Sequence, residues 1–342
     1  MHAREAAGRG DAGRARGGPG RAGRRARGPD EVSVRVGGSG VLAVNKAAGA
    51  TSFDVVALVR RRLHVRRVGH AGTLDPAATG VLPVLIGEAT KLTPYLMDQD
   101  KEYVATVRFG LTTDTHDTEG RVLSEVTVSR LERRDLEEAS RPFVGRIKQI
   151  PPMYSAVHHE GRRLYELARE GIEVDREPRE VVVHSIAVDE VAPPRATLRV
   201  VCGKGTYVRV LAADLGAALG YGGAVECLVR CRVGPFHLAD AIPWADVVSA
   251  EPAVLWSRVT PPESALAGWQ GVTLDERAAV AFGHGQAVEV RAPARGEGGS
   301  SVRVHDVTGT LIGVGVITED GRRVKPVRIL HADRPGTRIL PA

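Results

Sequence analysis

The sequence feature that most restricts the possible folds of this chain is a polar, glycine-rich loop followed directly by an apolar strand. Residues 69–80 contain one ionisable pair, His70 and Asp75, and residues 81–86 are all apolar. Asp75 precedes Pro76, and this step biases the aspartate toward an extended backbone and away from a helix interior. An Asp-Pro step in such a loop usually forms a turn, so these residues alone favour a turn and leave catalysis as the alternative.

The pattern around this loop indicates an α+β protein. Residues 41–44, 103–109 and 196–202 are typical of strands, and the last two alternate as half-buried strands do. A helix is predicted from Thr51, which forms a capping-box pair with Asp54 and is followed by apolar residues at helical spacing, namely Val55, Val56, Val59 and Leu63. A second helix is predicted over residues 208–219, ended by Gly220.

Three regions of the chain differ in composition. Residues 1–37 are almost entirely Gly, Arg, Ala and Pro, without the apolar side chains that offset the entropy of ordering, so we expect a disordered tail. Residues 38–260 form the main domain, in which about residues 145–180 are a polar insertion with a helix near residues 162–170. Short β-like runs after Pro261 and Pro262 predict a small all-β domain over residues 261–342.

The positive charge is concentrated at one end of the chain. The net charge is +6, and residues 1–29 alone reach +6 with eight arginines against Glu5 and Asp11. RNA binding by the folded body must therefore depend on local clusters. One cluster follows the first predicted helix, and it fits either a phosphate-contacting edge or simple solvation at a helix end: Arg60, Arg61, Arg62, Arg66 and Arg67.

Other features exclude several classes of protein. Three cysteines without a CxxC pair argue against a disulfide framework or a cysteine-rich zinc site, and we expect them to be reduced and mostly buried. Cys227 and Cys231 would lie one helical turn apart if the local structure is helical. Because no apolar run is long enough to span a membrane and no signal peptide precedes the body, we expect a cytoplasmic protein.

Several motifs in order resemble the TruB family of tRNA pseudouridine synthases. The loop and strand over residues 69–92 resemble the family's signature loop, and Lys101-Glu102-Tyr103 resembles its second motif. Residues 110–120 fit the turn that follows, residues 151–156 and 163–168 fit an inserted thumb, and residues 203–209 fit the third motif. The similarity covers about residues 40–260, and the end of the chain is similar to a PUA domain, a small RNA-binding β-barrel.

The resemblance implies a fold, an activity and a partner. It implies a pseudouridine synthase catalytic fold with a mixed, largely antiparallel central sheet, an inserted thumb and a PUA-like barrel. The implied reaction isomerises uridine to pseudouridine at position 55 in the T-loop of tRNA, on a base flipped into a pocket. The implied enzyme needs no cofactor and no metal, binds the T-arm of tRNA without a guide RNA, and acts as a monomer.

The same resemblance assigns the site residues. Asp75 is the expected catalytic carboxylate, Tyr103 the ring that stacks on the target base, and Arg209 the partner of Asp75. The residues expected to bind substrate are His70, Tyr207, Leu228, Lys46 and Arg230. Ala47, His158 and Val229 depart from the family pattern, which weakens any detailed assignment of phosphate contacts near Lys46, His158 and Arg230.

A carboxylate suits this chemistry because it can stabilise or trap the electron-poor sugar carbon left when the base departs. Asp75 must stay ionised in a pocket dry enough to keep water from the detached base, and a paired guanidinium such as Arg209 favours the charged form. Attack at C1′, attack at C6 and a glycal route all remain open. The acidic turn with Asp114, His116, Asp117 and Glu119 lacks a recognised metal-ligand spacing.

Two other functions compete with the enzyme. A non-enzymatic RNA-binding or RNA-folding protein would not need a carboxylate aimed at RNA, so the combination of Asp75, Tyr103 and Arg209 favours the isomerase. A guide-RNA-dependent relative would need a further docking segment, which we do not find beyond the C-terminal domain.

We expect deletion of residues 1–37 to weaken RNA association at low salt more than turnover, because an arginine-rich tail binds phosphates without sequence preference. Binding assays over a salt series, together with turnover at saturating RNA, measure the two effects. A large loss of turnover at saturating RNA would contradict this prediction.

Overall fold

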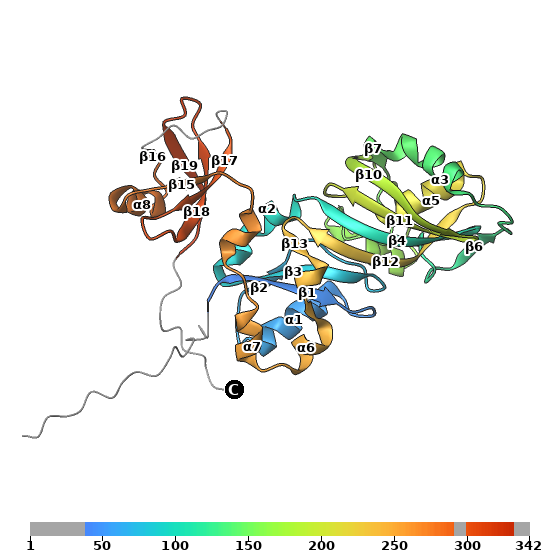
Figure 1. Ribbon diagram of the computed structural model, residues 1–342, viewed down its shortest axis with the longest axis horizontal. Coiled ribbons are helices and arrows are strands. Elements are labelled where there is room, and N and C mark those ends of the chain that lie inside the picture. Colours follow the sequence, from blue (N-terminus) through green and yellow to red (C-terminus); the bar gives the residue numbers. More distant parts are fainter. Residues whose placement is uncertain (1–37, 291–298, 332–342) are drawn as a thin grey trace, which may run out of the picture. The chain divides into compact units, whose positions relative to one another are not determined.

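The computed structural model describes residues 38–290 and 299–331 (Figure 1). The tail predicted over residues 1–37 lies outside the described residues. The main part is built on a ten-stranded sheet. Its strand order is β14 (Ile242–Pro243), β1 (Gly40–Lys46), β3 (Thr79–Ile86), β12 (Gly223–Val233), β4 (Lys101–Phe109), β11 (Arg195–Cys202), β10 (Arg179–Ala192) and β7 (Gly145–Gln149). Two short strands pair beside this path, β2 (Val68–His70) with β3 and β13 (Phe236–His237) with β12.

Only two of the pairings in this sheet are parallel, β1 with β14 and β3 with β12. All the other neighbours in the sheet run antiparallel. The prediction of a mixed, largely antiparallel central sheet is therefore confirmed. The parallel pair matters for function, because it sets the start of β3 beside β12 where the glycine-rich loop ends.

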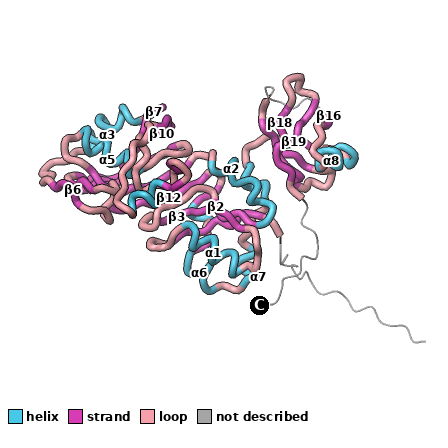
Figure 2. The backbone as a smooth tube through the Cα atoms, turned by 180° about the vertical axis from the view of Figure 1, so that it is seen from behind, coloured by secondary structure: helices cyan, strands magenta, loops and turns pink. Residues whose placement is uncertain are grey.

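One end of the sheet packs against three helices, α1 (Ser52–Arg62), α6 (Trp244–Ser249) and α7 (Pro252–Ser257) (Figure 2). The predicted capping box is present, since the Thr51 side chain accepts from Asp54 N and the Asp54 side chain accepts from Thr51 N. The apolar face predicted for α1 is buried with residues of β1 and β3. The cap therefore fixes where α1 begins, directly after the loop at residues 47–50.

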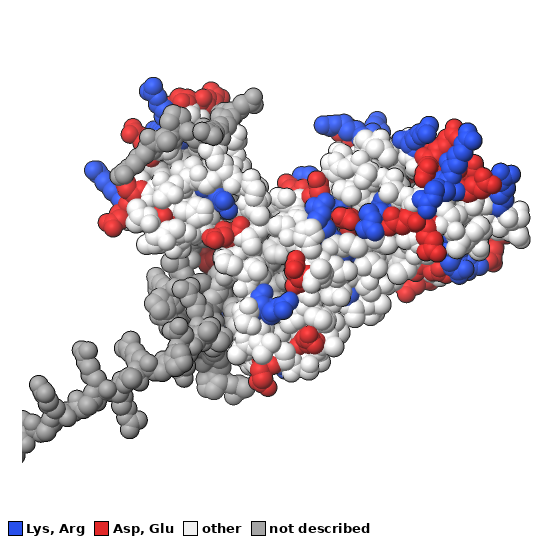
Figure 3. Space-filling view, viewed as in Figure 1, with Lys and Arg blue, Asp and Glu red and all other residues white. Residues whose placement is uncertain are grey.

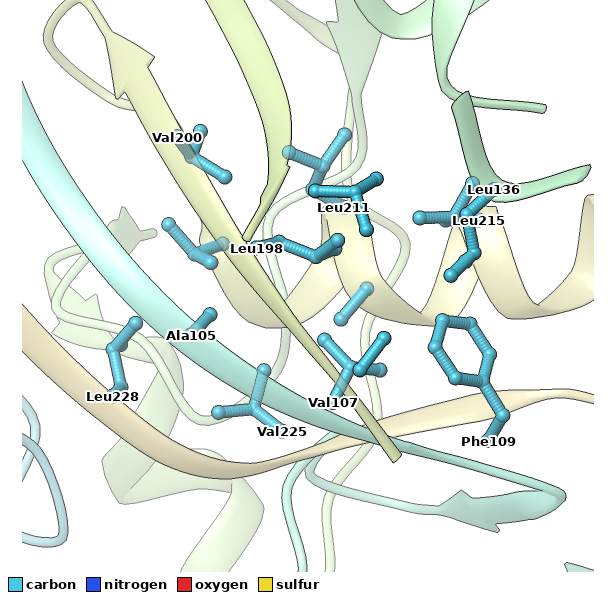
Figure 4. Packing of buried hydrophobic residues seen from close by; sticks show 14 of the residues in the cluster. Ala105, Val107, Phe109, Leu136, Leu198, Val200, Leu211, Leu215, Val225 and Leu228 are labelled. Carbon is cyan, nitrogen blue, oxygen red and sulfur yellow. The ribbon is translucent and has the colours of Figure 1, made fainter. Parts of the chain in front are cut away.

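The other end of the sheet packs against α3 (Arg133–Ser140) and α5 (Val208–Ala218). Figure 4 shows the side chains of β4, β11 and β12 meeting Leu211 and Leu215 of α5 in one apolar cluster. The helix predicted over residues 208–219 is confirmed, with Gly220 at φ +78° just after its end. Leu74 and Ala78 from the glycine-rich loop belong to the same cluster, so this core also anchors the loop.

Two excursions leave this sheet. The first is the hairpin β5 (Leu111–Thr113) with β6 (Val122–Glu125). The second lies in the predicted insertion and contains β8 (His158–His159), β9 (Arg162–Arg163) and α4 (Leu164–Arg169), the last within the helix predicted near residues 162–170. The short helical segments that remain are η1 (Gly87–Leu92), α2 (Thr93–Met97), η2 (Arg141–Phe143), η3 (Leu238–Asp240) and η4 (Pro262–Leu266).

The C-terminal part contains a five-stranded sheet and one helix. The strand order is β15 (Gly271–Thr273), β17 (Ser301–His305), β18 (Leu311–Ile317), β19 (Arg323–Ile329) and β16 (Val288–Glu289), with α8 at Glu276–Gly283. This arrangement agrees with a PUA-like domain, although the expectation of an all-β domain missed α8, which buries Phe282 against the sheet. The domain boundary at residue 261 stays a prediction.

The cysteines lie differently from the expectation. Cys227 and Cys231 are on strand β12, paired with β4, so the interpretation of a local helical turn is wrong. Cys202 is buried, whereas Cys227 is exposed and Cys231 is half-buried. The helical interpretation failed because pairing with β4 and β3 overrides local spacing.

Charges of both signs are interspersed on the sheet around β4, β10 and β11 (Figure 3). Arg199 contacts Glu102 at 3.1 Å and Asp189 at 2.8 Å, and Arg195 contacts Glu226 at 2.6 Å. These exposed pairs make one face of the sheet polar and contribute little to stability. Within residues 38–290 and 299–331, no helix combines the length and the apolar character needed to cross a membrane.

We expect Gly80→Ala to destabilise the protein by more than about 2 kcal/mol, because it combines strain with overlap. Gly80 has φ +111°, and a Cβ there would lie 2.3 Å from the carbonyl oxygen of Arg230. Gly69→Ala is the control, since a Cβ at Gly69 meets nothing within 4 Å. Chemical denaturation measures both, and equal losses would show that close packing at Gly80 is not the cause.

Candidate active site

Asp75 lies at the tip of the loop between β2 and β3. The neighbouring Leu74 and Ala78 are buried in the core, and Ala78 N donates to Asp75 O at 3.1 Å to close a turn. The two apolar anchors leave the carboxylate outside the core, with 39% of its side chain exposed. The loop is thus a turn, as the sequence alone favours, and it also presents a carboxylate that a ligand can reach.

Five consecutive backbone carbonyls of this loop each accept a hydrogen bond. Those of Gly72 and Thr73 accept from the guanidinium of Arg230, at 3.1 and 3.2 Å. The carbonyl of Leu74 accepts from Ser52 Oγ at 3.1 Å, and that of Asp75 accepts from Ala78 N. The last, on Pro76, accepts from Lys46 Nζ at 3.0 Å and from Gly49 N at 2.9 Å. A loop with five consecutive carbonyls paired in this way is held in one conformation.

Arg209 is the partner of Asp75. Its Nε lies 2.8 Å from Asp75 Oδ2, and only 6% of its side chain is exposed. The remaining nitrogens donate to Thr115 O at 2.8 Å and Tyr154 O at 3.0 Å, and Asp117 Oδ2 lies 3.6 Å away. The guanidinium is therefore fixed by three segments of the chain, and it holds the carboxylate in one direction.

Two tyrosines lie near the Asp75 carboxylate, and Leu228 belongs to the apolar cluster against which one of them packs. Tyr103, on β4, packs against the apolar cluster that contains Leu228 of β12. Burial raises the pKa of the Tyr103 and Tyr207 hydroxyls, and the Asp75 carboxylate raises both further, as expected for groups near one another. Tyr207 precedes α5, and its backbone is bonded on both sides by the Gln149 side chain, at 3.0 and 3.3 Å. Tyr103 and Tyr207, from distant parts of the sequence, thus lie near one carboxylate.

His70 is the last residue of β2, opposite Val84 of β3. Burial lowers the pKa of its imidazole, and the charge of Arg230 lowers it further. A neutral imidazole is therefore favoured at the start of the glycine-rich loop.

Lys46 and Arg230 differ from the expectation that they contact substrate directly. Both are buried, at 0% and 1% exposure. Lys46 Nζ donates to three carbonyls, those of Ala47, Ala50 and Pro76, at 2.7 to 3.0 Å. A side chain with every donor used on the backbone has none left for a phosphate. The geometry favours a role in holding the loop.

Sequence reasoning missed several contributors to this site. Asp117 appeared only as part of an acidic turn, and the structure sets it beside Arg209. Ser52 and Gln149 carried no signal, because their roles depend on contacts with segments 22 and 58 residues away. Among the described residues, no group of three or more His, Cys, Asp or Glu could hold a metal ion.

Comparisons with known proteins identify the family of the chain. Residues 60–208 match a family described as TruB family pseudouridylate synthase, N-terminal domain. Residues 271–330 match one described as pseudouridine synthase II TruB, C-terminal. The tRNA pseudouridine synthase B of Saccharophagus degradans is 43% identical over 300 residues, covering 85% of this chain and 96% of the relative. That of Pseudomonas aeruginosa (strain UCBPP-PA14) is 45% identical over 298 residues, covering 86% and 96%.

Solved structures share the fold. An H/ACA ribonucleoprotein bound to a substrate RNA containing 2′-deoxyuridine matches with a TM-score of 0.66 at 24% identity, over 85% of each chain. A Cbf5–Nop10–Gar1 complex matches with a TM-score of 0.65 at 26% identity, over 89% of this chain and 86% of the other.

We expect Lys46→Met to change how stability depends on pH. Burial lowers the pKa of Lys46 from 10.5 to about 8. Between these two values the unfolded chain binds more protons at this residue than the folded protein does, so the contribution of Lys46 to the free energy of unfolding rises with pH. Urea unfolding of both proteins from about pH 7.5 to about pH 10 measures this contribution.

The difference in free energy of unfolding should shift in favour of the wild type as the pH rises through that window. Lys204→Met is the control for removal of a positive charge, because Lys204 is exposed and pairs with Asp98 at 2.9 Å. A difference between wild type and Lys46→Met that stays flat or falls would contradict the lowered pKa.

Proposed function

Because the chain belongs to the TruB family of pseudouridine synthases, we propose that it isomerises the uridine at position 55 in the T-loop of tRNA. The observation that carries the proposal is the 2.8 Å ion pair between the buried Arg209 and the partly exposed Asp75. An accessible carboxylate held in a fixed direction is a group suited to breakage of a glycosidic bond. The family's reaction involves no net oxidation or reduction.

Asp75 acts on the ribose of a nucleotide that has left the helical stack. A stacked base cannot bring its sugar to a carboxylate on the protein, so the target swings out at a cost of a few kcal/mol. The ring of Tyr103 offsets this cost, because stacking on an aromatic ring contributes about 1–3 kcal/mol per base. Tyr207 and Leu228 complete the apolar surroundings of the base.

The N1–C1′ bond breaks, the uracil turns and its C5 joins C1′; C5 then loses its proton and N1 gains one, so the reaction is a net isomerisation. Asp75 either stabilises or traps the sugar at C1′, adds to C6 of the base, or removes a sugar proton on a glycal route, and one carboxylate at this place is compatible with all three. The exposed part of Asp75 must be covered during this step, because water would otherwise intercept the intermediate. The bound RNA supplies that cover.

The partner in this proposal is the T-arm of tRNA, in the cytoplasm, recognised by a monomer without a guide RNA. A protein that only binds RNA is less consistent with the site. A carboxylate facing a polyanion weakens binding, so a role in chemistry accounts for it better than a role in binding. The site supplies such a carboxylate together with a buried arginine that orients it.

We expect Asp75→Asn to abolish conversion of unmodified tRNA while binding persists. The amide keeps the shape of the side chain but loses the charge, so the single-turnover rate should fall on the order of 10³-fold or more. Incubation with tRNA transcript, followed by chemical derivatisation and mapping of pseudouridine, measures conversion in the T-loop. Filter binding measures the affinity.

Asp98→Asn is the matched control, since this exposed carboxylate pairs with Lys204 on the surface. It should convert tRNA as the wild type does. Undiminished conversion by Asp75→Asn would refute the role of Asp75, and absence of conversion by the wild type would refute the proposed substrate.

A further inference from the structure

Arg230 is a buried charge at the centre of the sheet. It lies on β12, with Gly80 of β3 opposite on one side and Tyr103 of β4 opposite on the other. Only 1% of the residue is exposed, and among the ion pairs of the described residues none contains Arg230. Burying a cation without a bonded carboxylate costs several kcal/mol, so stability alone does not account for it.

The donors of Arg230 reach both ends of the glycine-rich loop. Nε donates to Val81 O at 2.9 Å, just after the loop. The two terminal nitrogens donate to Thr73 O and Gly72 O, which precede Asp75. The planar fork of a guanidinium donates in fixed directions to two backbone segments, and an ammonium at the same position would not reproduce that geometry.

The same guanidinium acts on Tyr103. Opposite residues on antiparallel strands share a face, so the Tyr103 ring and the Arg230 side chain point to the same side of the sheet. Burial raises the pKa of Tyr103, and the nearby charge of Arg230 opposes that rise. On the other side Gly80 leaves no room for a Cβ, so β3 and the end of the loop lie directly against the Arg230 backbone.

We propose that Arg230 is a positioning residue for the isomerisation, which joins the Asp75 loop to the strand pair that carries Tyr103. The inference rests on the proposed function. By bonding the loop from inside, Arg230 fixes the carboxylate relative to the ring, so both reach the same flipped nucleotide. It touches neither base nor phosphate. Its effect therefore falls on the rate of the chemical step and not on the affinity for tRNA.

The test compares Arg230→Met, which removes all donors, with Arg230→Lys, which keeps one charged donor group. A misplacement of about 1 Å can cost about 100-fold in rate, so we expect a loss of that order in single-turnover rate for Arg230→Met. Arg230→Lys should lose about 10-fold, because an ammonium can bond only one end of the loop. The dissociation constant for tRNA should stay within about threefold for both, since no phosphate contact is removed.

Arg232→Met is the matched control, on the same strand and with a guanidinium that lies 3.6 Å from Glu102. It should keep the wild-type rate and affinity. If Arg230→Met does not fold, Arg230→Lys decides the question alone. An unchanged rate for Arg230→Lys, or a weaker affinity with an unchanged rate, would overturn the proposal and favour direct contact with RNA.

A second measurement does not depend on activity. Amide hydrogen exchange of peptides that cover residues 71–78 should speed up in Arg230→Lys and not in Arg232→Met, because only the first loses bonds to the loop. Unchanged exchange would overturn the positioning role even if the enzyme is active. If exchange is faster in Arg230→Lys but the wild type makes no pseudouridine, the contact between Arg230 and the loop is supported and the proposed function is refuted.

Discussion

The ion pair between Arg209 and Asp75 lies where the core meets the surface, and the arrangement of the site follows from that position. Arg209 is buried and bonded to the carbonyls of Thr115 and Tyr154, so it cannot follow the carboxylate into solvent. The Asp75 carboxylate must therefore point toward Arg209, and this fixes the orientation of the carboxylate. A charged partner that is already in place needs no reorganisation when charge develops on a bound ribose.

The loop that carries Asp75 would be a poor platform by itself, because it is short, polar and rich in glycine. Its backbone is instead paired with groups from the surrounding structure. Ser52 both donates to Leu74 O and accepts from Leu74 N, while Lys46 and Arg230 bond the carbonyls on either side. Two buried cations thus replace the regular pairing that a strand would have supplied. The charge-assisted hydrogen bonds that these cations donate recover part of the cost of burying them.

The sequence predicts those parts of the structure that depend on neighbours along the chain. The capping box at Thr51, the alternation of β4 and the end of α5 at Gly220 are local patterns, and all are confirmed. Cys227 and Cys231 were misassigned, because β12 is defined by its partners β3 and β4 and not by its own spacing. Lys46 and Arg230 could be identified as residues of interest from the family motifs. Their burial could not, since it depends on carbonyls 30 and 158 residues away.

The charged residues on the surface of the sheet and those buried near Asp75 are arranged differently. The surface of the sheet pairs its charges, as with Arg195 and Glu226, so it contributes little net attraction for RNA. Inside, the cationic side chains of Lys46, Arg209 and Arg230 are buried close to Asp75 and Asp117; burial lowers the pKa of both Lys46 and His70, and the charge of Arg230 lowers both further. A positive interior below an accessible carboxylate tolerates the negative charge of Asp75 and of a departing uracil together. The same interior disfavours a further cation, and this repulsion adds to the effect of burial in lowering the pKa of the His70 imidazole.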